Sequence, residues 1–326
     1  MSWKMPAEWA KHERTWVAFP AADYAQQEDA YLAWSAVANT ASEYEEVTVL
    51  VDPKQLEVAK KYISKEIQLV ECPLDDSWIR DMGATFVIDE GKLGAIDWVF
   101  NGWGAQSWAN YKQDDLVAKF MAELVAAKHI KSDLVNEGGG IHTNGNGLLL
   151  VTETVQLGVE RNPDWTRNEV EAELIEKLGV EKVIWVRRGL TRDYETFGTK
   201  GHIDIVACFS DENTILVHDQ QDESHPDYAV SHEVINRLTE TGCRIVKVPA
   251  PKITKDSEGF VDYSYINHYV CNGAVILCSF DDPGDARAAA ILAEAYPGRE
   301  IVLVDARPIF SRGGGIHCIT QQVPAV

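Results

Sequence analysis

Residues 203–248 read IDIVACFSDENTILVHDQQDESHPDYAVSHEVINRLTETGCRIVKV, and their pattern decides the fold class. The apolar, β-branched runs Ile203–Phe209 and Thr214–Val217 predict two strands joined by a short polar turn. Helical spacing follows over Tyr228–Glu240, and Arg244–Val248 predicts one more strand. Because the first two strands come as a hairpin-like pair, the pattern favours a mixed sheet over a doubly wound parallel sheet.

The same order recurs along the chain. His268–Ser279 predicts the next strand pair, Asp285–Ala295 a helix and Ile301–Val304 a further strand. Other predicted strands are Val47–Val51, Ile67–Cys72, Thr85–Ile88, Gly94–Val99, Leu148–Thr152 and Lys182–Val186, and other predicted helices are Asp29–Tyr44, Asp114–Ala127 and Thr166–Leu178, with Asp29, Asp114, Thr166 and Asp285 as capping residues. About five such modules fit the length. No linker divides the chain, so we expect one α/β domain over residues 1–326.

The composition limits the classes of molecule that we expect the protein to bind. The formal net charge is −21, from 51 acidic and 30 basic residues, which argues against binding to nucleic acid or an anionic membrane. A negative field suits a cationic small molecule. No apolar run approaches the roughly 20 residues that span a bilayer, and the N-terminus lacks a signal-peptide pattern. We therefore expect a cytoplasmic protein whose six cysteines are reduced thiols.

Polar clusters with glycines interrupt the apolar pattern at strand boundaries. They lie at residues 75–83, 136–142, 201–204 and 312–322. The last contains Cys318 and the third contains His202, a pairing typical of a nucleophile and its acid–base partner. Three carboxylates accompany them: Asp81, Glu137 and Asp204. That is more than a hydrolase acting on a neutral acyl group needs, and a planar guanidinium held between carboxylates would explain the excess.

Taken in order, the motifs resemble the agmatine deiminase branch of the guanidino-group-modifying enzymes, which are peptidylarginine-deiminase-like. The matching stretches are Met5–Trp9, His12–Trp16, Asp76–Asp81, Asn101–Gly104, Glu137–Gly139, Gly201–Asp204 and Gly313–Gln322. The resemblance covers nearly the whole chain. It implies a five-bladed α/β-propeller, the pentein fold, built from repeated ββαβ modules.

The resemblance also implies roles for single residues. Cys318 would be the nucleophile and His202 the general acid and base, with Glu137 holding His202. Asp81 and Asp204 would clamp the guanidinium. Further substrate-binding residues would be Trp78, Trp103, Gly315 and Glu195. Neither metal nor organic cofactor is implied, and the family resemblance favours a homo-oligomer, most simply a homodimer.

The histidines beside these motifs do not suggest a metal. His142 and His317 match no zinc-site spacing with His202. We expect His317 to face away from the neighbouring thiol, since adjacent residues of a strand point to opposite faces.

One stretch departs from the family pattern. Members have an acidic run of the form D-E-T-N-G-H directly before the histidine, near the far amine of agmatine. Here the segment is DYETFGTKGH, residues 193–202, with Lys200 close to His202 and Glu195 farther away. Glu195 reaches the amine if the loop bends, whereas Lys200 would suit the carboxylate of an arginine-like substrate.

The function predicted first is hydrolysis of agmatine to N-carbamoylputrescine and ammonia, a step towards putrescine, through a covalent thiouronium intermediate. Three alternatives stay open. One is a deiminase of another alkylguanidine or of an arginine-like substrate. The second is an amidinotransferase of the same fold. The third is a guanidinium-binding protein without turnover, against which the presence of Cys318, His202 and Glu137 argues.

Overall fold

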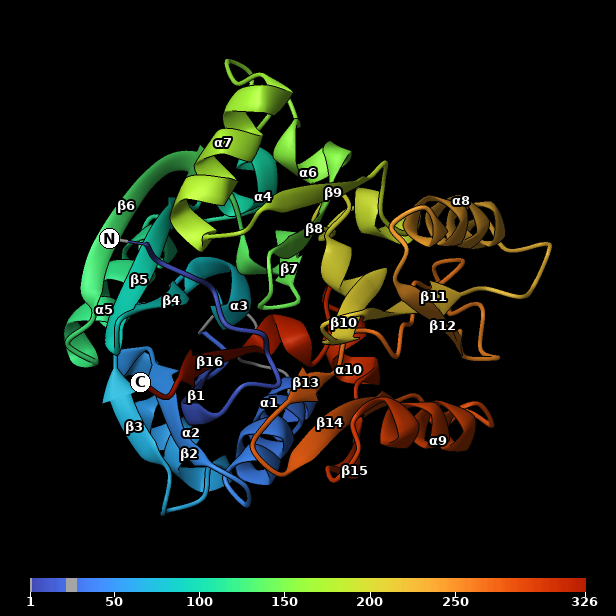
Figure 1. Ribbon diagram of the computed structural model, residues 1–326. Helices are drawn as coiled ribbons and strands as arrows, with labels where there is room; N and C mark the ends of the chain where they lie inside the picture. The colour runs from blue at the N-terminus through green and yellow to red at the C-terminus, as the bar shows by residue number, and fades with distance from the viewer. Residues whose placement is uncertain (1, 22–27) are drawn as a thin grey trace.

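The computed structural model describes residues 2–21 and 28–326, and in this part of the chain the strands form five small sheets arranged around a centre (Figure 1). The sheets have the orders β16-β1-β2-β3, β4-β5-β6, β7-β8-β9, β10-β11-β12 and β13-β14-β15. The strands are β1 His12–Ala18, β2 Glu46–Val51, β3 Gln68–Glu71, β4 Thr85–Asp89, β5 Lys92–Val99, β6 Lys128–Val135, β7 Ile141–Thr143, β8 Leu148–Thr152, β9 Lys182–Val186, β10 Ala207–Asp211, β11 Thr214–Asp219, β12 Arg244–Pro249, β13 Tyr269–Val270, β14 Ala274–Ser279, β15 Glu300–Asp305 and β16 Thr320–Pro324.

Each sheet is mixed, as the sequence predicted: an antiparallel pair is joined by one parallel strand, or by two in the first sheet. In the fourth sheet β10 runs antiparallel to β11, and β12 runs parallel to β11 with Thr214 opposite Arg244. Helix α8, Asp227–Thr239, is the crossover that a parallel pair requires. The predicted start of β10 was wrong. Residues Ile203–Ile205 form a 3₁₀ turn instead. The turn begins directly after His202 and contains Asp204.

The helices are α1 Glu28–Ala41, α2 Leu56–Tyr62, α3 Ile79–Met82, α4 Gly102–Ala105, α5 Val117–Leu124, α6 Glu153–Gln156, α7 Arg167–Leu178, α8, α9 Asp285–Ala295 and α10 Arg307–Phe310. Thr166 caps α7 in a capping box with Glu169, as predicted. Asp29 and Asp285 lie inside the first turns of α1 and α9, so they are not the predicted N-caps. Asp114 begins a short 3₁₀ helix before α5 and instead accepts backbone N–H groups of the 75–76 segment.

The two ends of the chain pair in one sheet. β1 and β16 run antiparallel, with Thr15 opposite Gln322, so the ring of sheets closes between the first and last strands. Sequence patterning missed both strands, since β1 carries charged residues and a bulge and β16 is rich in polar side chains. Closure brings the N-terminal segment beside the glycine-rich C-terminal motif.

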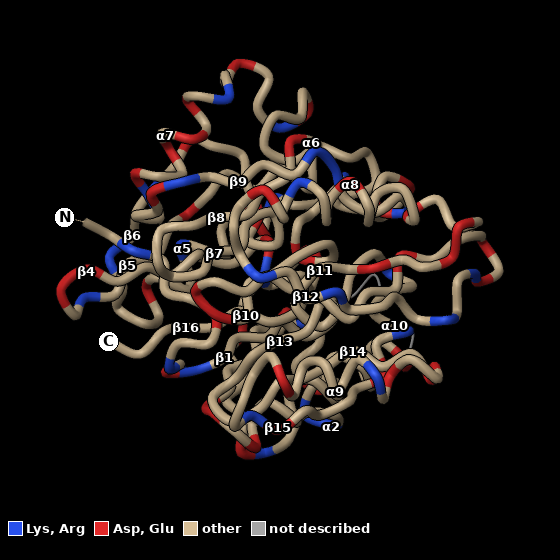
Figure 2. The backbone as a smooth tube through the Cα atoms, turned by 45° about the vertical axis from the view of Figure 1, so that its right-hand side comes forward, with Lys and Arg blue, Asp and Glu red and all other residues tan. Residues whose placement is uncertain are grey.

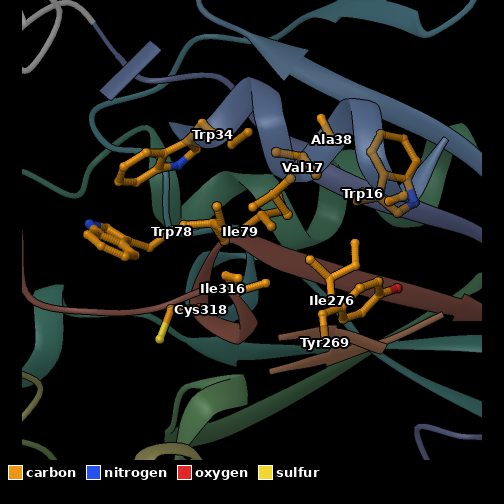
Figure 3. Packing of buried hydrophobic residues seen from close by; sticks show 14 of the residues in the cluster. Trp16, Val17, Trp34, Ala38, Trp78, Ile79, Tyr269, Ile276, Ile316 and Cys318 are labelled. Atoms are coloured by element: carbon orange, nitrogen blue, oxygen red, sulfur yellow. The ribbon is translucent and has the colours of Figure 1, made fainter. Parts of the chain in front are cut away.

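Apolar packing fixes the backbone around Cys318 (Figure 3). Trp34 meets Trp78 edge to face at 5.4 Å between ring centroids, and Ile79 and Ile316 are fully buried beside them. The Cys318 sulfur points away from the labelled apolar side chains. A rigid wall therefore presents the thiol to the polar centre of the ring.

Charge is spread over the molecule. Figure 2 shows Asp and Glu distributed along the described backbone with Lys and Arg interspersed. Within residues 2–21 and 28–326, no helix combines the length and apolar character that crossing a bilayer requires.

Candidate active site

Cys318 lies in a 3₁₀ turn, His317–Ile319, directly after the glycine run. Its side chain is 3% exposed. The Asn267 side-chain amide donates to Sγ at 3.3 Å and the Gly315 N–H at 3.4 Å, while Asp204 Oδ2 is 3.5 Å away. Burial and the nearby Asp204 and Asp81 carboxylates raise the pKa of the Cys318 thiol well above its usual value. Without a cation at the site, the sulfur is therefore held as a neutral thiol near neutral pH.

His202 faces two carboxylates. Its Nε2 is 3.3 Å from Glu137 Oε2, and its Nδ1 is 3.8 Å from Asp81 Oδ1. Burial opposes the charged ring, but Asp81, Glu137 and Asp204 outweigh it and raise the pKa of His202 to about 9. The ring is therefore an imidazolium near neutral pH, ready to give up a proton.

Arg161, which sequence reasoning missed, anchors Glu137. Its Nε donates to both carboxylate oxygens, at 2.9 and 3.1 Å, and its Nη2 donates to the Thr199 carbonyl at 2.7 Å. Burial raises the pKa of Glu137, but Arg161 and His202 together outweigh burial and hold this pKa below its usual value. Arg161 thus ties Glu137 to the loop that leads to His202.

Asp81 comes from α3. Its Oδ1 accepts the Gly139 N–H at 3.0 Å, and its Oδ2 accepts Trp103 Nε1–H at 2.8 Å. Burial raises the pKa of Asp81, an effect that His202 only partly offsets. Arg80 makes an ion pair with Glu8, at 3.4 Å from Nη1 to Oε1, so Asp81 is not its partner.

Asp204 is held by His317, contrary to expectation. His317 Nδ1 is 2.9 Å from Asp204 Oδ2. The prediction put His317 and Cys318 on opposite faces of a strand. They lie instead in a 3₁₀ turn, where successive side chains do not alternate in this way, and both contact Asp204 Oδ2. Despite burial, His317 holds the pKa of Asp204 below its usual value.

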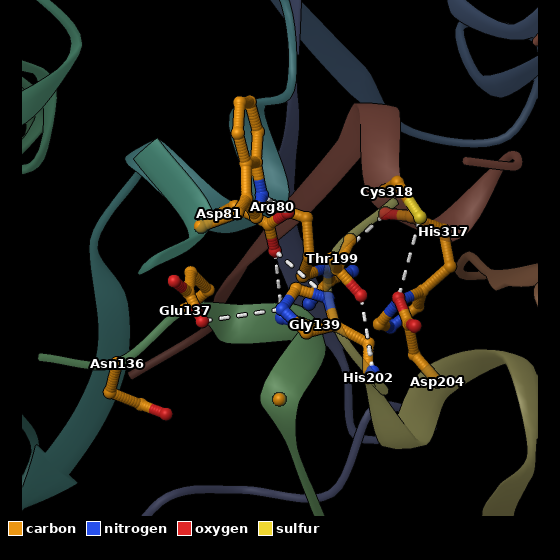
Figure 4. A network of polar contacts seen from close by, with 12 residues as sticks. Arg80, Asp81, Asn136, Glu137, Gly139, Thr199, His202, Asp204, His317 and Cys318 are labelled. Carbon is orange, nitrogen blue, oxygen red and sulfur yellow. Dashed lines mark hydrogen bonds and ion pairs between the residues drawn. The ribbon is translucent and has the colours of Figure 1, made fainter. Parts of the chain in front are cut away.

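Two buried polar atoms at the centre make no hydrogen bond within the described part of the chain: His202 Nδ1, whose contact with Asp81 is too long for one, and Asp204 Oδ1. Gly139 lies between them. A Cβ on Gly139 would come within 2.5 Å of His202 Nδ1 and 2.9 Å of oxygens of Asp81 and Asp204. Figure 4 shows these side chains pointing toward one another, with Cys318 beside Asp204. The absence of a side chain on Gly139 therefore lets these three polar groups lie close together.

Aromatic side chains line the approach. Trp78 is packed so closely on Gly314 that a Cβ there would lie 2.6 Å from its ring. Trp103 adopts a left-handed backbone conformation, φ 56°, and stacks on Trp108 at 5.5 Å. Gly315, whose N–H meets the thiol, has no room for a side chain beside Asn267. Asn267, which contacts the thiol, was not among the residues that the sequence suggested.

Glu195 is set apart from this cluster. With Arg192, Glu258, Asp262, Phe310 and Gly313 it lines a cavity of about 300 Å³. Lys200 Nζ donates to the carbonyls of Tyr194 and Glu195, at 2.8 and 3.2 Å. These two hydrogen bonds stabilise the loop that contains Lys200.

Comparison with known proteins identifies the family of the chain. Residues 4–324 match the model of the Porphyromonas-type peptidyl-arginine deiminase family. A Streptomyces coelicolor protein provisionally named an agmatine deiminase is 50% identical over 99% of both chains. The agmatine deiminase of Ectopseudomonas mendocina is 36% identical over 98% of this chain and 95% of its own. The chain belongs to the agmatine deiminase family.

Solved structures agree with this family. An Enterococcus faecalis agmatine deiminase, described as catalysing its reaction, superposes with a TM-score of 0.93 at 30% identity, covering 99% of this chain and 96% of that one. An amidinotransferase from Microseira wollei matches with a TM-score of 0.52 at 12% identity, which shows a shared fold alone. The predicted agmatine deiminase family and five-bladed α/β fold are confirmed.

The described residues contain no group of three or more His, Cys, Asp and Glu side chains placed to hold a metal ion. His142 is used elsewhere: its Nδ1 accepts the Phe209 N–H at 3.2 Å, and its Nε2 faces Glu8 at 3.6 Å.

Proposed function

We propose that this protein hydrolyses agmatine to N-carbamoylputrescine and ammonia, with Cys318 as the nucleophile. The observation that carries the proposal is the pair of unpartnered buried atoms, His202 Nδ1 and Asp204 Oδ1, beside a thiol and a second carboxylate. A guanidinium offers N–H donors to Asp81 and Asp204 and puts its carbon in front of Sγ. A Campylobacter jejuni agmatine deiminase, in a cysteine-to-serine variant solved with substrate bound, has a TM-score of 0.91 to this chain at 27% identity.

Substrate binding prepares the nucleophile. The carboxylates of Asp204 and Asp81 disfavour a thiolate in the empty site. A bound guanidinium neutralises them and favours release of the Cys318 proton to solvent. Sγ then attacks the guanidinium carbon, and an S–C bond forms in a tetrahedral adduct.

His202 completes both halves of the reaction. As an acid it gives a proton to the departing nitrogen, so the C–N bond breaks and ammonia leaves behind a thiouronium on Cys318. The neutral ring then takes a proton from water, whose oxygen bonds to the same carbon. The C–S bond breaks, the hydroxyl proton of the adduct passes to sulfur, the ureido product leaves, and the thiol is restored. Glu137 stabilises the charged ring throughout.

The amine end of agmatine lies toward Glu195 in this proposal. The cavity that Glu195 lines also reaches Gly313, one residue from the glycine packed on Trp78. Arg192 is occupied by Asp256 and Glu258 at 2.8 and 2.9 Å, which leaves Glu195 as a carboxylate for an ammonium group. Lys200, bonded to backbone carbonyls, is not available to an arginine carboxylate. The acidic cavity therefore favours agmatine over arginine.

The test measures ammonia and ureido product with agmatine, arginine, guanidinobutyrate and methylguanidine, without an added amine. We expect agmatine to have the highest kcat/KM, about 100-fold or more above arginine. Ammonia release without an acceptor amine separates a deiminase from an amidinotransferase. A preference for arginine would overturn the agmatine assignment. Size-exclusion chromatography of the same preparation tests the homodimer that the family resemblance favours.

A further inference from the structure

A buried pair of ionisable residues lies behind Asp204, on the side away from the substrate space. His317 Nε2 is 2.8 Å from Glu8 Oε1, while His317 Nδ1 is 2.9 Å from Asp204 Oδ2. All three residues are at most 4% exposed. They come from distant parts of the sequence, since Glu8 belongs to the N-terminal segment and His317 precedes Cys318.

Both ring nitrogens of His317 face carboxylate oxygens. An ionised carboxylate can only accept a hydrogen bond, so each nitrogen must carry a proton to make its contact. A neutral imidazole has one N–H and would leave one close nitrogen–oxygen pair without a hydrogen bond. His142, also beside Glu8, is different: its Nδ1 accepts a backbone N–H, which requires that nitrogen to be unprotonated. Geometry therefore distinguishes a charged His317 from a neutral His142.

The surroundings of His317 are consistent with that charge. Burial and Arg80 lower the pKa of His317, but Glu8 and Asp204 outweigh them and raise it. Glu8 is also paired with Arg80. His268 is bonded to the Tyr265 carbonyl and the Tyr296 hydroxyl, and burial lowers its pKa to about 4, so it adds no charge.

The pair determines which oxygen of Asp204 is available. His317 occupies Oδ2, the oxygen that also lies 3.5 Å from the Cys318 thiol. Oδ1 is buried and has no hydrogen-bond partner in the described structure. A carboxylate fixed at one oxygen presents the other in a defined direction. Asp204 must also be ionised to accept from a guanidinium, and a cation behind it favours that form.

We propose that His317 is a permanent imidazolium, kept charged by Glu8, and that the two are positioning residues that hold Asp204 ionised with Oδ1 toward the substrate. The assignment of Asp204 to the substrate rests on the proposed function. The charge state of His317 does not.

The first experiment observes the ring directly. Full-length protein with ring-¹⁵N histidine is studied by NMR between about pH 6 and about pH 9, where an ordinary histidine loses its charge. The His317→Asn spectrum assigns the His317 signals. We expect both ring nitrogens to remain protonated across this range. In Glu8→Gln the ring should lose its Nε2 proton within it, because one anion has been removed. A neutral His317 in the wild-type protein near neutral pH would overturn the proposal, whatever the enzyme's substrate.

The second experiment measures kinetics with agmatine. In Glu8→Gln we expect KM to rise about 10-fold with a smaller change in kcat, and the rise to depend on pH as His317 titrates. The matched control is His268→Gln, which alters a buried histidine that contacts no carboxylate. It should lower the melting temperature without making KM depend on pH. Equal kinetic effects of both substitutions would mean that Glu8 acts only on stability, and this would contradict the positioning role.

Discussion

The carboxylate of Glu137 faces the imidazole of His202, with Oε2 3.3 Å from Nε2, and both side chains are almost completely buried. Arg161 holds the other side of that carboxylate. This contact sets the acid strength of the ring, because the pKa of His202, raised to about 9 despite burial, depends on Asp81 and Glu137.

Glu137→Gln is expected to move the pH profile. The folded-state pKa of His202 is raised, so the protonated acid is present at lower pH and is lost as pH rises through about 9. Removing the Glu137 charge lowers that pKa, so activity should begin to fall at a lower pH, and kcat should drop about 100-fold or more. The pH dependence of kcat and kcat/KM checks this. If activity falls at the same high pH in the variant, a group other than His202 sets that fall.

Alkylation of Cys318 should report the protonation state of the thiol. Because burial, Asp204 and Asp81 raise its pKa, iodoacetamide should modify the substrate-free enzyme slowly near neutral pH and faster as pH increases. Peptide mass spectrometry separates Cys318 from Cys243, which is partly exposed. A fast rate that is independent of pH around neutrality would mean that the thiolate already exists in the free enzyme.

Gly139→Ala tests the close approach of His202, Asp81 and Asp204 to one another. The new methyl group would lie 2.5 Å from His202 Nδ1 and 2.9 Å from Asp81 and Asp204 oxygens. We expect kcat/KM for agmatine to fall about 100-fold or more, since displacement of catalytic groups by about an ångström has effects of this size. Gly140→Ala is the matched control, because its methyl group would meet Val155 at 3.1 Å. Similar losses in both variants would indicate general disruption of the turn.

Glu195→Gln tests the amine end. Glu195 is exposed, and an exposed ion pair contributes at most about 1 kcal/mol, which corresponds to an increase in KM of up to roughly fivefold. The increase should appear with agmatine and be absent with an alkylguanidine that lacks the amine, such as butylguanidine. If both substrates lose the same affinity, Glu195 does not contact the amine.

The modular fold could be predicted because its signals are local. Strand β9 and helix α7 have the bounds that apolar runs and the Thr166 cap predicted. The closing pair β1 and β16 could not be found in this way, since its stability comes from contacts between the two ends of the chain.

The candidate site was predictable where chemistry is concentrated in motifs. Four separate segments bring together the side chains of Cys318, His202, Glu137, Asp81 and Asp204. Arg161 and Asn267 were missed because each lies outside the glycine-rich motifs and acts through contacts to residues far away in the sequence. The orientation of His317 was predicted from a strand pattern, but the segment is a 3₁₀ turn. The two cannot be told apart from the sequence over so short a segment.

The most direct measurement of the central claim is mass spectrometry of enzyme quenched with acid during turnover of agmatine. The peptide containing Cys318 should gain the mass of agmatine less ammonia, the thiouronium adduct, and Cys318→Ser should show neither adduct nor ureido product. Absence of the adduct together with full activity in Cys318→Ser would contradict it.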